Sequence, residues 1–210
     1  MAGKLLIERV AGVHCDAEQA AEFSYREPLL TSQDTVIGIS QSGETVDTLM
    51  AVREAKRKGA VVRGIVNVIG STIARETGAG TYIHAGPELA VASTKAYTNM
   101  VAILLLYALQ FGRLKNLQLG TGQQLLKALL EIPAKINRVL EQSDEIAKLA
   151  KKYQKQQNFF FLGRGVCYPV ALEGSLKLKE IAYVPSEAFP GGEMKHGPLA
   201  LVSEGFPVVA

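Results

Sequence analysis

The first half of the chain alternates short apolar runs with longer amphipathic stretches. Residues 36–39 form a β-rich run that ends in the polar turn 40–45 (SQSGET). After this turn, apolar residues recur at helical spacing as far as Gly59, which is a typical residue to end a helix. The apolar residues on this predicted helix face are Val46, Leu49 and Met50. The pattern therefore predicts a strand, a turn and a helix.

The same alternation continues along the chain. Residues 61–66 and 81–84 have the composition of strands, and a helix is predicted from Ser93 and Thr94 to about Phe111. Strands that alternate with helices are typical of a parallel sheet covered by helices on both faces. We therefore expect an α/β lobe in this half of the chain.

A second strand–turn–helix unit follows a long helical region. Residues 123–156 have helical spacing, and 158–162 then predict a strand that ends at a glycine-rich turn. A helix is predicted over 169–182, and 206–209 predict a further strand. This arrangement indicates a second α/β lobe.

Three segments describe the expected organisation. Residues 1–117 form a first lobe, 118–148 form connecting helices, and 149–210 form a second lobe. Both lobes are expected to be three-layered, with parallel sheets flanked by helices, and each is expected to be incomplete at its outer end.

Composition excludes several classes of partner. Apolar residues make up 48% of the sequence and charged residues 20%, as in folded globular proteins. The 23 basic and 20 acidic residues give a formal charge of +3, which is too small to favour nucleic acid or anionic lipid. Lysines cluster at Lys151, Lys152 and Lys155, which we interpret as a solvated helix face. The longest apolar run, 101–109, is about half of a membrane span, so no membrane is expected.

Cysteine usage and the beginning of the sequence indicate a compartment. Cys15 and Cys167 are far apart and form no CxxC pair, which fits a reducing environment. The apolar stretch near Met1 is too short for the core of a signal peptide. We therefore expect a cytoplasmic protein.

Three common kinds of catalytic or cofactor site are missing from the sequence. There is no GxxxxGK[ST] phosphate loop, and the glycines around Arg164 lack the third glycine of a dinucleotide fingerprint. The three histidines, His14, His84 and His196, are not spaced as metal ligands on a helix. No GxSxG serine elbow is present. We therefore expect neither a bound nucleotide nor catalytic zinc.

The turn 40–45 is the first candidate site. The start of a helix offers backbone N–H groups and a positive dipole end, which suit a phosphate monoester. Polar donors surround this point, namely Ser40, Gln41, Ser42 and Thr45. The alternative is that one hydroxyl only caps the helix. Ser93 and Thr94, at the start of the next helix, join the same pocket if the two turns converge.

The second lobe carries two further candidates. Glu173, Lys177 and Glu180 share one helix face, either as an exposed salt-bridged stripe or as a proton-transfer pair on a partly buried face. His196 lies in a glycine-flanked loop, where it is either structural or able to act on a ligand.

Five motifs in order resemble one known family over nearly the whole chain. They are SQSGET (40–45), VASTKAYT (91–98), LGRG (162–165), LEGSLKLKEI (172–181) and GEMKHGPLAL (192–201). SQSGE is similar to the sugar isomerase (SIS) domains in general. VASTKAYT together with LKLKE and KHGPLAL resembles the isomerase domain of the glutamine:fructose-6-phosphate amidotransferases, also called glucosamine-6-phosphate synthases.

The resemblance implies two SIS lobes that bind fructose 6-phosphate or glucosamine 6-phosphate, with residue roles carried over by motif. Ser40, Gln41, Ser42 and Thr45 would hold the phosphate. Val91 and Ser93 would face the sugar. Glu180 would move a proton between C1 and C2, assisted by Lys177. His196 would open the sugar ring from the neighbouring subunit of a homodimer. The resemblance also implies that no metal or organic cofactor is needed.

The sequence departs from this family at both ends. It lacks the glutaminase domain, the first strand with its Gly-Thr-Ser turn, and the C-terminal tail whose lysine forms a Schiff base with the open sugar. We therefore expect most of an isomerase site but not a complete catalyst. Two alternatives are a non-catalytic SIS module that senses a phosphosugar and a deglycase of sugar-amine phosphates.

Overall fold

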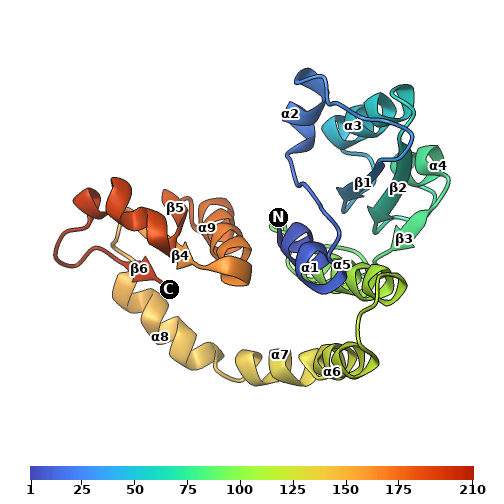
Figure 1. Cartoon of the computed structure of the whole chain (residues 1–210). Helices are drawn as coiled ribbons and strands as arrows, with labels where there is room; N and C mark the ends of the chain where they lie inside the picture. The colour runs from blue at the N-terminus through green and yellow to red at the C-terminus, as the bar shows by residue number, and fades with distance from the viewer. The chain divides into compact units, whose positions relative to one another are not determined.

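The computed structural model describes residues 1–210 and divides into two compact units (Figure 1). The first unit contains Met1, Gly3 and 14–108, and the second contains Ala2, 4–13 and 109–210. Each unit has one sheet of three strands, and every strand pair is parallel. The expected α/β class, with parallel sheets flanked by helices, is confirmed.

The helices and strands have the following bounds. They are α1 (Ala2–Ala11), α2 (Ala20–Tyr25), β1 (Thr35–Ser40), α3 (Val46–Arg57), β2 (Val61–Val66), α4 (Thr72–Thr77), β3 (Gly80–Tyr82), α5 (Lys95–Leu114), α6 (Leu119–Leu130), α7 (Ile132–Leu140), α8 (Ser143–Tyr153), β4 (Phe159–Gly163), η1 (Gly165–Cys167), α9 (Tyr168–Ala182), β5 (Ser186–Pro190), η2 (Gly191–His196), η3 (Pro198–Leu201) and β6 (Val208–Val209).

The first sheet has the strand order β1-β2-β3. The predicted strands at 36–39 and 61–66 are confirmed, whereas the third begins at Gly80 and ends before the predicted 81–84 does. Gly80 pairs with Gly64 of β2, and a Cβ on Gly80 would lie 2.0 Å from the Gly64 carbonyl oxygen. The close approach of β2 and β3 therefore requires glycine, a residue that sequence patterns count against a strand.

Helices cover both faces of this first sheet. The side chains of each strand alternate between these faces, so residues of one strand pack against helices on either side. On one face, Val62 and Val66 pack with buried residues of α3 and α4. On the other face, Ile65 packs with Ala96 and Ile103 of α5. The predicted two-sided cover is confirmed in this unit.

The buried face of α3 differs from the predicted one. Val46 is 69% exposed and Met50 is 49% exposed, and of the three predicted residues only Leu49 packs against the core. The residues that α3 buries are Thr48, Ala51, Val52 and Ala55. Small side chains let the helix approach β1 closely, and Val52 occupies the space that a Cβ on Gly38 would fill. A pattern based on the largest apolar residues therefore selects the wrong face.

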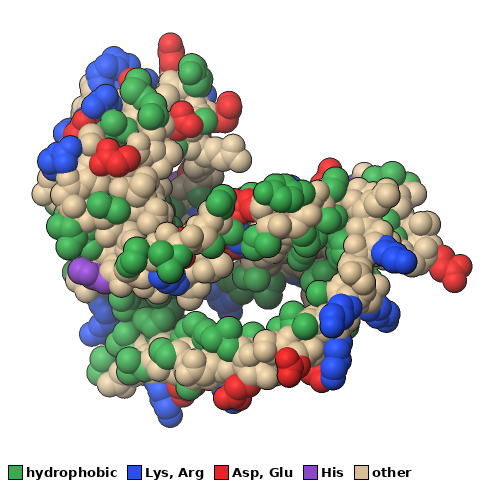
Figure 2. All heavy atoms as spheres, turned by 180° about the vertical axis from the view of Figure 1, so that it is seen from behind, with side chains coloured by type: hydrophobic (Ala, Val, Ile, Leu, Met, Phe, Trp, Pro, Cys, Tyr) green, Lys and Arg blue, Asp and Glu red, His purple; other side chains and the backbone are tan.

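The helical region predicted over 123–156 consists of three helices, α6, α7 and α8. Many of their apolar side chains lie at the surface, and Figure 2 shows green side chains along this helical segment. They include Leu126, Leu130, Ile132, Ile136, Val139, Leu140, Ile146 and Leu149. None of the helices in the chain combines the length and the apolar character that a membrane span needs.

The second sheet has the strand order β5-β4-β6, and α9 packs on β4 and β5. The predicted strand at 158–162 and the helix at 169–182 are confirmed, while the last strand is shorter than the predicted 206–209. On the face opposite α9, Phe160 is 5% exposed, and its ring packs against Phe189 and Phe206. An aromatic cluster therefore forms part of the core on this face of the second sheet.

Two adjacent small residues fix how α9 lies on its sheet. A Cβ on Gly174 would lie 3.0 Å from the ring of Phe161 in β4. The buried hydroxyl of Ser186 in β5 lies 3.1 Å from the Ser175 hydroxyl and donates to the Ser175 carbonyl oxygen at 2.8 Å. Close packing and buried hydrogen bonds therefore set both the distance and the rotation of α9.

Candidate functional site

The turn 40–45 follows β1 at the carboxyl end of the first sheet, where α/β sheets commonly bind ligands. Ser40 is 5% exposed, and its Oγ lies 2.8 Å from Oγ1 of Thr45 and accepts a hydrogen bond from the Gly43 N–H at 3.0 Å. The Ser42 Oγ accepts from the Glu44 N–H at 3.1 Å. The hydroxyl groups therefore fold the backbone of the turn into a compact loop.

These contacts show that the hydroxyl of Thr45 does not cap α3. Thr45 is the N-cap residue of α3, yet its side chain makes no capping hydrogen bond to the helix and pairs with Ser40 instead. The first N–H groups of a helix have no partner within that helix. The start of α3 therefore keeps the donors and the positive dipole end that an anion requires.

The turn is attached to the residue after β2 and to the start of α4 by three hydrogen bonds. The Gln41 carbonyl accepts from the Asn67 N–H at 3.0 Å, and the Gly43 carbonyl accepts from the Ile73 N–H at 2.9 Å. The Glu44 carboxylate accepts from the Thr72 N–H at 2.7 Å. The hydrogen bonds from the Thr72 backbone and then its side chain lower the pKa of Glu44 below its ordinary 4.5.

We predict a pH-dependent contribution of Glu44 to stability. A carboxylate whose pKa is lowered on folding stabilises the folded state fully above its unfolded pKa, here near 4.5, and loses this contribution as the pH falls further. Below about pH 4.5, the free energy of unfolding should therefore fall more steeply for wild type than for Glu44→Gln. Urea unfolding between pH 7 and pH 3 measures both slopes, and parallel slopes would contradict the prediction.

Gly43 occupies a position that excludes any side chain. Its φ is +66°, and a Cβ there would lie 2.0 Å from the Ser71 Oγ and 2.5 Å from the Ser71 Cβ. Ser71 is 3% exposed, and its hydroxyl has no hydrogen-bond partner. The conformation of the turn therefore depends on glycine at this point.

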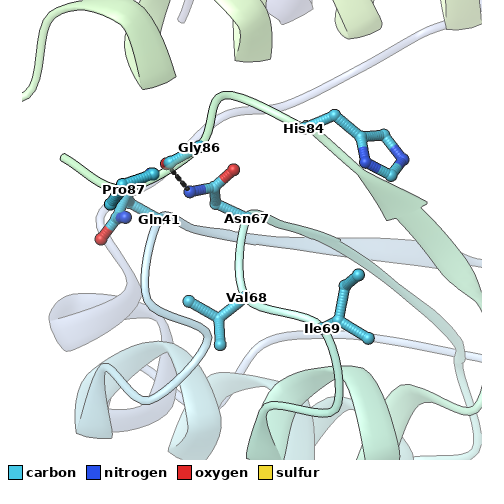
Figure 3. Close-up of a pocket in the computed structure, with 7 residues that line it drawn as sticks. All are labelled: Gln41, Asn67, Val68, Ile69, His84, Gly86 and Pro87. Atoms are coloured by element: carbon cyan, nitrogen blue, oxygen red, sulfur yellow. Dashed lines mark hydrogen bonds between the residues drawn. The ribbon is translucent and has the colours of Figure 1, made fainter.

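A surface hollow of about 510 Å³ adjoins the turn (Figure 3). Its lining comes from the segments that follow all three strands of the sheet, and it consists of Gln41, Asn67, Val68, Ile69, His84, Gly86 and Pro87. Gln41 is therefore the candidate phosphate residue that also faces this hollow. The hollow is large enough for a small polar ligand next to the turn.

Val91 and Ser93 lie on the loop between β3 and α5. Val91 is 99% exposed, and neither residue lines the hollow, although the beginning of the same loop does. The Ser93 hydroxyl donates to the Glu88 carboxylate at 3.2 Å, and the Ala96 N–H donates to the same oxygen at 3.2 Å. Glu88 therefore holds the start of α5 and orients Ser93.

In the second unit, the predicted common face of Glu173, Lys177 and Glu180 is confirmed. The Lys177 Nζ lies 2.5 Å from Oε2 of Glu180 and 3.4 Å from Oε1 of Glu173, and all three side chains are partly buried. Burial alone would lower the pKa of Lys177, but the hydrogen bond to Glu180 and the charge of Glu173 outweigh it and raise this pKa above 10.5. Lys177 is therefore an ammonium ion between two carboxylates at neutral pH.

His196 ends the short helix η2 and is exposed. The second unit thus contains all three predicted catalytic residues, and the first unit contains all predicted phosphate and sugar residues. No group of three His, Cys, Asp or Glu side chains is placed to hold a metal ion.

Sequence reasoning missed two residues that shape the site. Asn67 and Glu88 each bridge backbone segments near the candidate residues. Asn67 directly follows β2 at the carboxyl edge of the sheet, and a polar residue at such a position is the signal that could have revealed it. Glu88 lies in a loop without periodicity, so no comparable signal exists for it.

Similarity to known proteins supports one fold family. Residues 1–110 and 152–210 match the model of the SIS domain. The glutamine–fructose-6-phosphate aminotransferase (isomerizing) of Chlorobaculum tepidum is 50% identical over 207 residues, which cover 99% of this chain and 34% of that enzyme. The chain therefore spans about a third of the length of the curated relatives it matches.

Two solved structures show the same similarity. The C-terminal domain of glucosamine-fructose-6-phosphate aminotransferase from Francisella tularensis superposes with a TM-score of 0.96 at 40% identity, over 99% of this chain and 59% of that one. Glucosamine-6-phosphate deaminase from Thermotoga maritima superposes with a TM-score of 0.81 at 25% identity, over 99% and 61% of the two chains.

Proposed function

The chain belongs to the SIS domain family, and we propose that it is the phosphosugar-binding isomerase part of a glucosamine-6-phosphate synthase. The observation that carries this proposal is the hydroxyl-rich turn 40–45 at the uncapped start of α3. The 40% identity to the Francisella aminotransferase domain supports the substrate, fructose 6-phosphate, and the product, glucosamine 6-phosphate.

The phosphate would bind at the start of α3. Ser42, Thr45 and Gln41 are accessible enough to donate to its oxygens, whereas the buried Ser40 maintains the shape of the turn. The charge of Glu44 is held away at the start of α4, which favours an anion at the turn. Val91 and Ser93 would contact the sugar from the following loop.

The proton-transfer step would use α9. Glu180 would accept and return the proton as it moves between C1 and C2 of the open sugar. Because Lys177 stays protonated, its role would be to hold Glu180 and to stabilise negative charge that develops on the substrate. No metal or organic cofactor is needed for this proton transfer.

Several features of the assembly belong to the same proposal. The two units would be two SIS lobes, bounded at 117/118 and 148/149 with the helices between them as a connector. His196 would open the sugar ring in the neighbouring subunit of a homodimer, and its exposure makes it accessible to a second subunit. A cytoplasmic location, expected from the cysteine spacing in the sequence, belongs to the same proposal.

Calorimetric titration with fructose 6-phosphate tests the phosphate site. Ser42→Ala removes one hydroxyl donor to a charged group, which is worth about 1.5–3 kcal/mol, so the affinity should fall about 10- to 150-fold. Ser32→Ala, at an exposed turn before β1, is the matched control and should bind like wild type. Equal affinities of the two variants, or wild type without binding, would refute the proposed phosphate site.

Two alternatives make different predictions in the same preparation. A phosphosugar sensor would bind fructose 6-phosphate without exchanging its C1 protons with solvent. A deglycase would release sugar phosphate from a sugar-amine phosphate. The similarity to glucosamine-6-phosphate deaminase is the observation that favours this alternative.

A further inference from the structure

We propose that Asn67 is a positioning residue that fixes the loop after β3 relative to the turn 40–45. The inference rests on the proposed function, because these two segments carry the proposed sugar and phosphate contacts. Neither the family match nor the sequence motifs assign a role to Asn67.

Three hydrogen bonds converge on Asn67. Its backbone N–H donates to the Gln41 carbonyl oxygen at 3.0 Å. Its side-chain Oδ1 accepts from the Ala85 N–H at 2.9 Å, and its Nδ2 donates to the Gly86 carbonyl oxygen at 2.7 Å (Figure 3). One residue therefore connects the segments that follow all three strands of the first sheet.

The loop needs such a connection because its own backbone is irregular. His84 and Gly86 both have positive φ angles, +48° and +69°, and Pro87, Leu89 and Val91 are exposed. Apolar packing holds the segment at Ile83, Ala85 and Ala92, but not at the exposed residues between Ala85 and Ala92. The amide of Asn67 provides the donor and the acceptor that two successive peptide groups of the loop require.

Because the amide acts as both donor and acceptor, its two functions can be separated. Asn67→Ala removes both side-chain hydrogen bonds and leaves the backbone bond to Gln41. Asn67→Asp keeps the acceptor for Ala85, but an ionised carboxylate faces the Gly86 carbonyl oxygen without a proton to donate. Protonation of that carboxyl group restores the donor.

The binding test compares fructose 6-phosphate with inorganic phosphate. If Asn67 positions the loop, Asn67→Ala weakens fructose 6-phosphate binding about tenfold, as expected for loss of about 1.4 kcal/mol, and changes phosphate binding less than twofold. In Asn67→Asp, the fructose 6-phosphate affinity relative to wild type should rise as the pH falls from 8 to 5. Equal weakening of both ligands in Asn67→Ala would overturn the proposal.

Asn99→Ala is the matched control. The Asn99 Nδ2 donates to the Ile83 carbonyl oxygen at 3.0 Å, so this variant also removes an amide hydrogen bond to the segment after β3, but not the link to the turn 40–45. It should bind both ligands within twofold of wild type. A loss of fructose 6-phosphate selectivity equal to that of Asn67→Ala would overturn the special role of Asn67.

Amide hydrogen exchange in the ligand-free protein separates this proposal from the proposed function. In Asn67→Ala, the Ala85 amide should exchange at least about tenfold faster, while the Ile73 amide keeps its wild-type rate. An unchanged rate at Ala85 overturns the positioning role. If wild type binds no fructose 6-phosphate, the proposed function fails, and the exchange rates alone decide whether Asn67 holds the loop.

Discussion

Replacing Gly43 with alanine should lower the free energy of unfolding by roughly 2–5 kcal/mol and abolish phosphosugar binding. An alanine at φ +66° costs about 1–2 kcal/mol, because its Cβ approaches its own backbone. The new Cβ also overlaps the buried Ser71 hydroxyl, and such overpacking costs about 1–3 kcal/mol. Urea unfolding and titration with fructose 6-phosphate measure both effects.

The structure provides a matched control for the backbone part of this effect. Gly78 has nearly the same φ, +65°, but a Cβ there would meet no atom within 4 Å. Gly78→Ala should therefore lose only about 1–2 kcal/mol and keep its ligand affinity. Adding Ser71→Gly to Gly43→Ala removes the atoms that the new Cβ would overlap. The double variant should therefore lose only as much free energy of unfolding as Gly78→Ala. A double variant no more stable than Gly43→Ala would show that Ser71 is not the obstacle.

Glu180→Gln should lower the rate of proton exchange at C1 of fructose 6-phosphate about 10²- to 10⁴-fold, the usual contribution of a general base. The affinity for the sugar phosphate should change less than about threefold, since the proposed phosphate contacts lie in the first unit. Deuterium incorporation in heavy water, followed by NMR, measures the proton transfer without requiring the amination step.

Glu173→Gln is the control on the same helix face. Glu173 also pairs with Lys177, at 3.4 Å, so its replacement perturbs the same ammonium group without removing the proposed base. Its exchange rate should stay within about tenfold of wild type. Equal losses of exchange rate in the two variants would indicate that exchange depends on the charge around Lys177 rather than on Glu180 as the base. A wild-type protein that binds fructose 6-phosphate without proton exchange would favour the sensor.

Elements with a strong local pattern could be predicted from the sequence. The strand at 61–66 has the predicted bounds because it is rich in β-branched residues, of which Val62, Ile65 and Val66 are buried. The turn 40–45 is recognisable from the sequence because four polar donors fall within six residues. The face shared by Lys177 and Glu180 follows from helical spacing alone, and the structure reproduces it.

Features that depend on distant partners could not be predicted. Asn67 and Gly86 are 19 positions apart, and Glu44 and Thr72 are 28 apart, so neither hydrogen bond leaves a periodic signal. The strand β5 contains glutamate and proline, which are depleted in strands, and it exists because it pairs with β4. Only the folded chain brings these partners together.

In α9, the residues that pack the helix on its sheet are different from the charged residues proposed for proton transfer. Gly174 and Ser175 contact Phe161 and Ser186 of the sheet, whereas the ion pairs of Lys177 are with Glu173 and Glu180 of the same helix. Substitution of the charged residues therefore leaves the contacts of Gly174 and Ser175 in place. Related proteins can therefore differ in the charged residues of this helix and still pack it on the sheet in the same way.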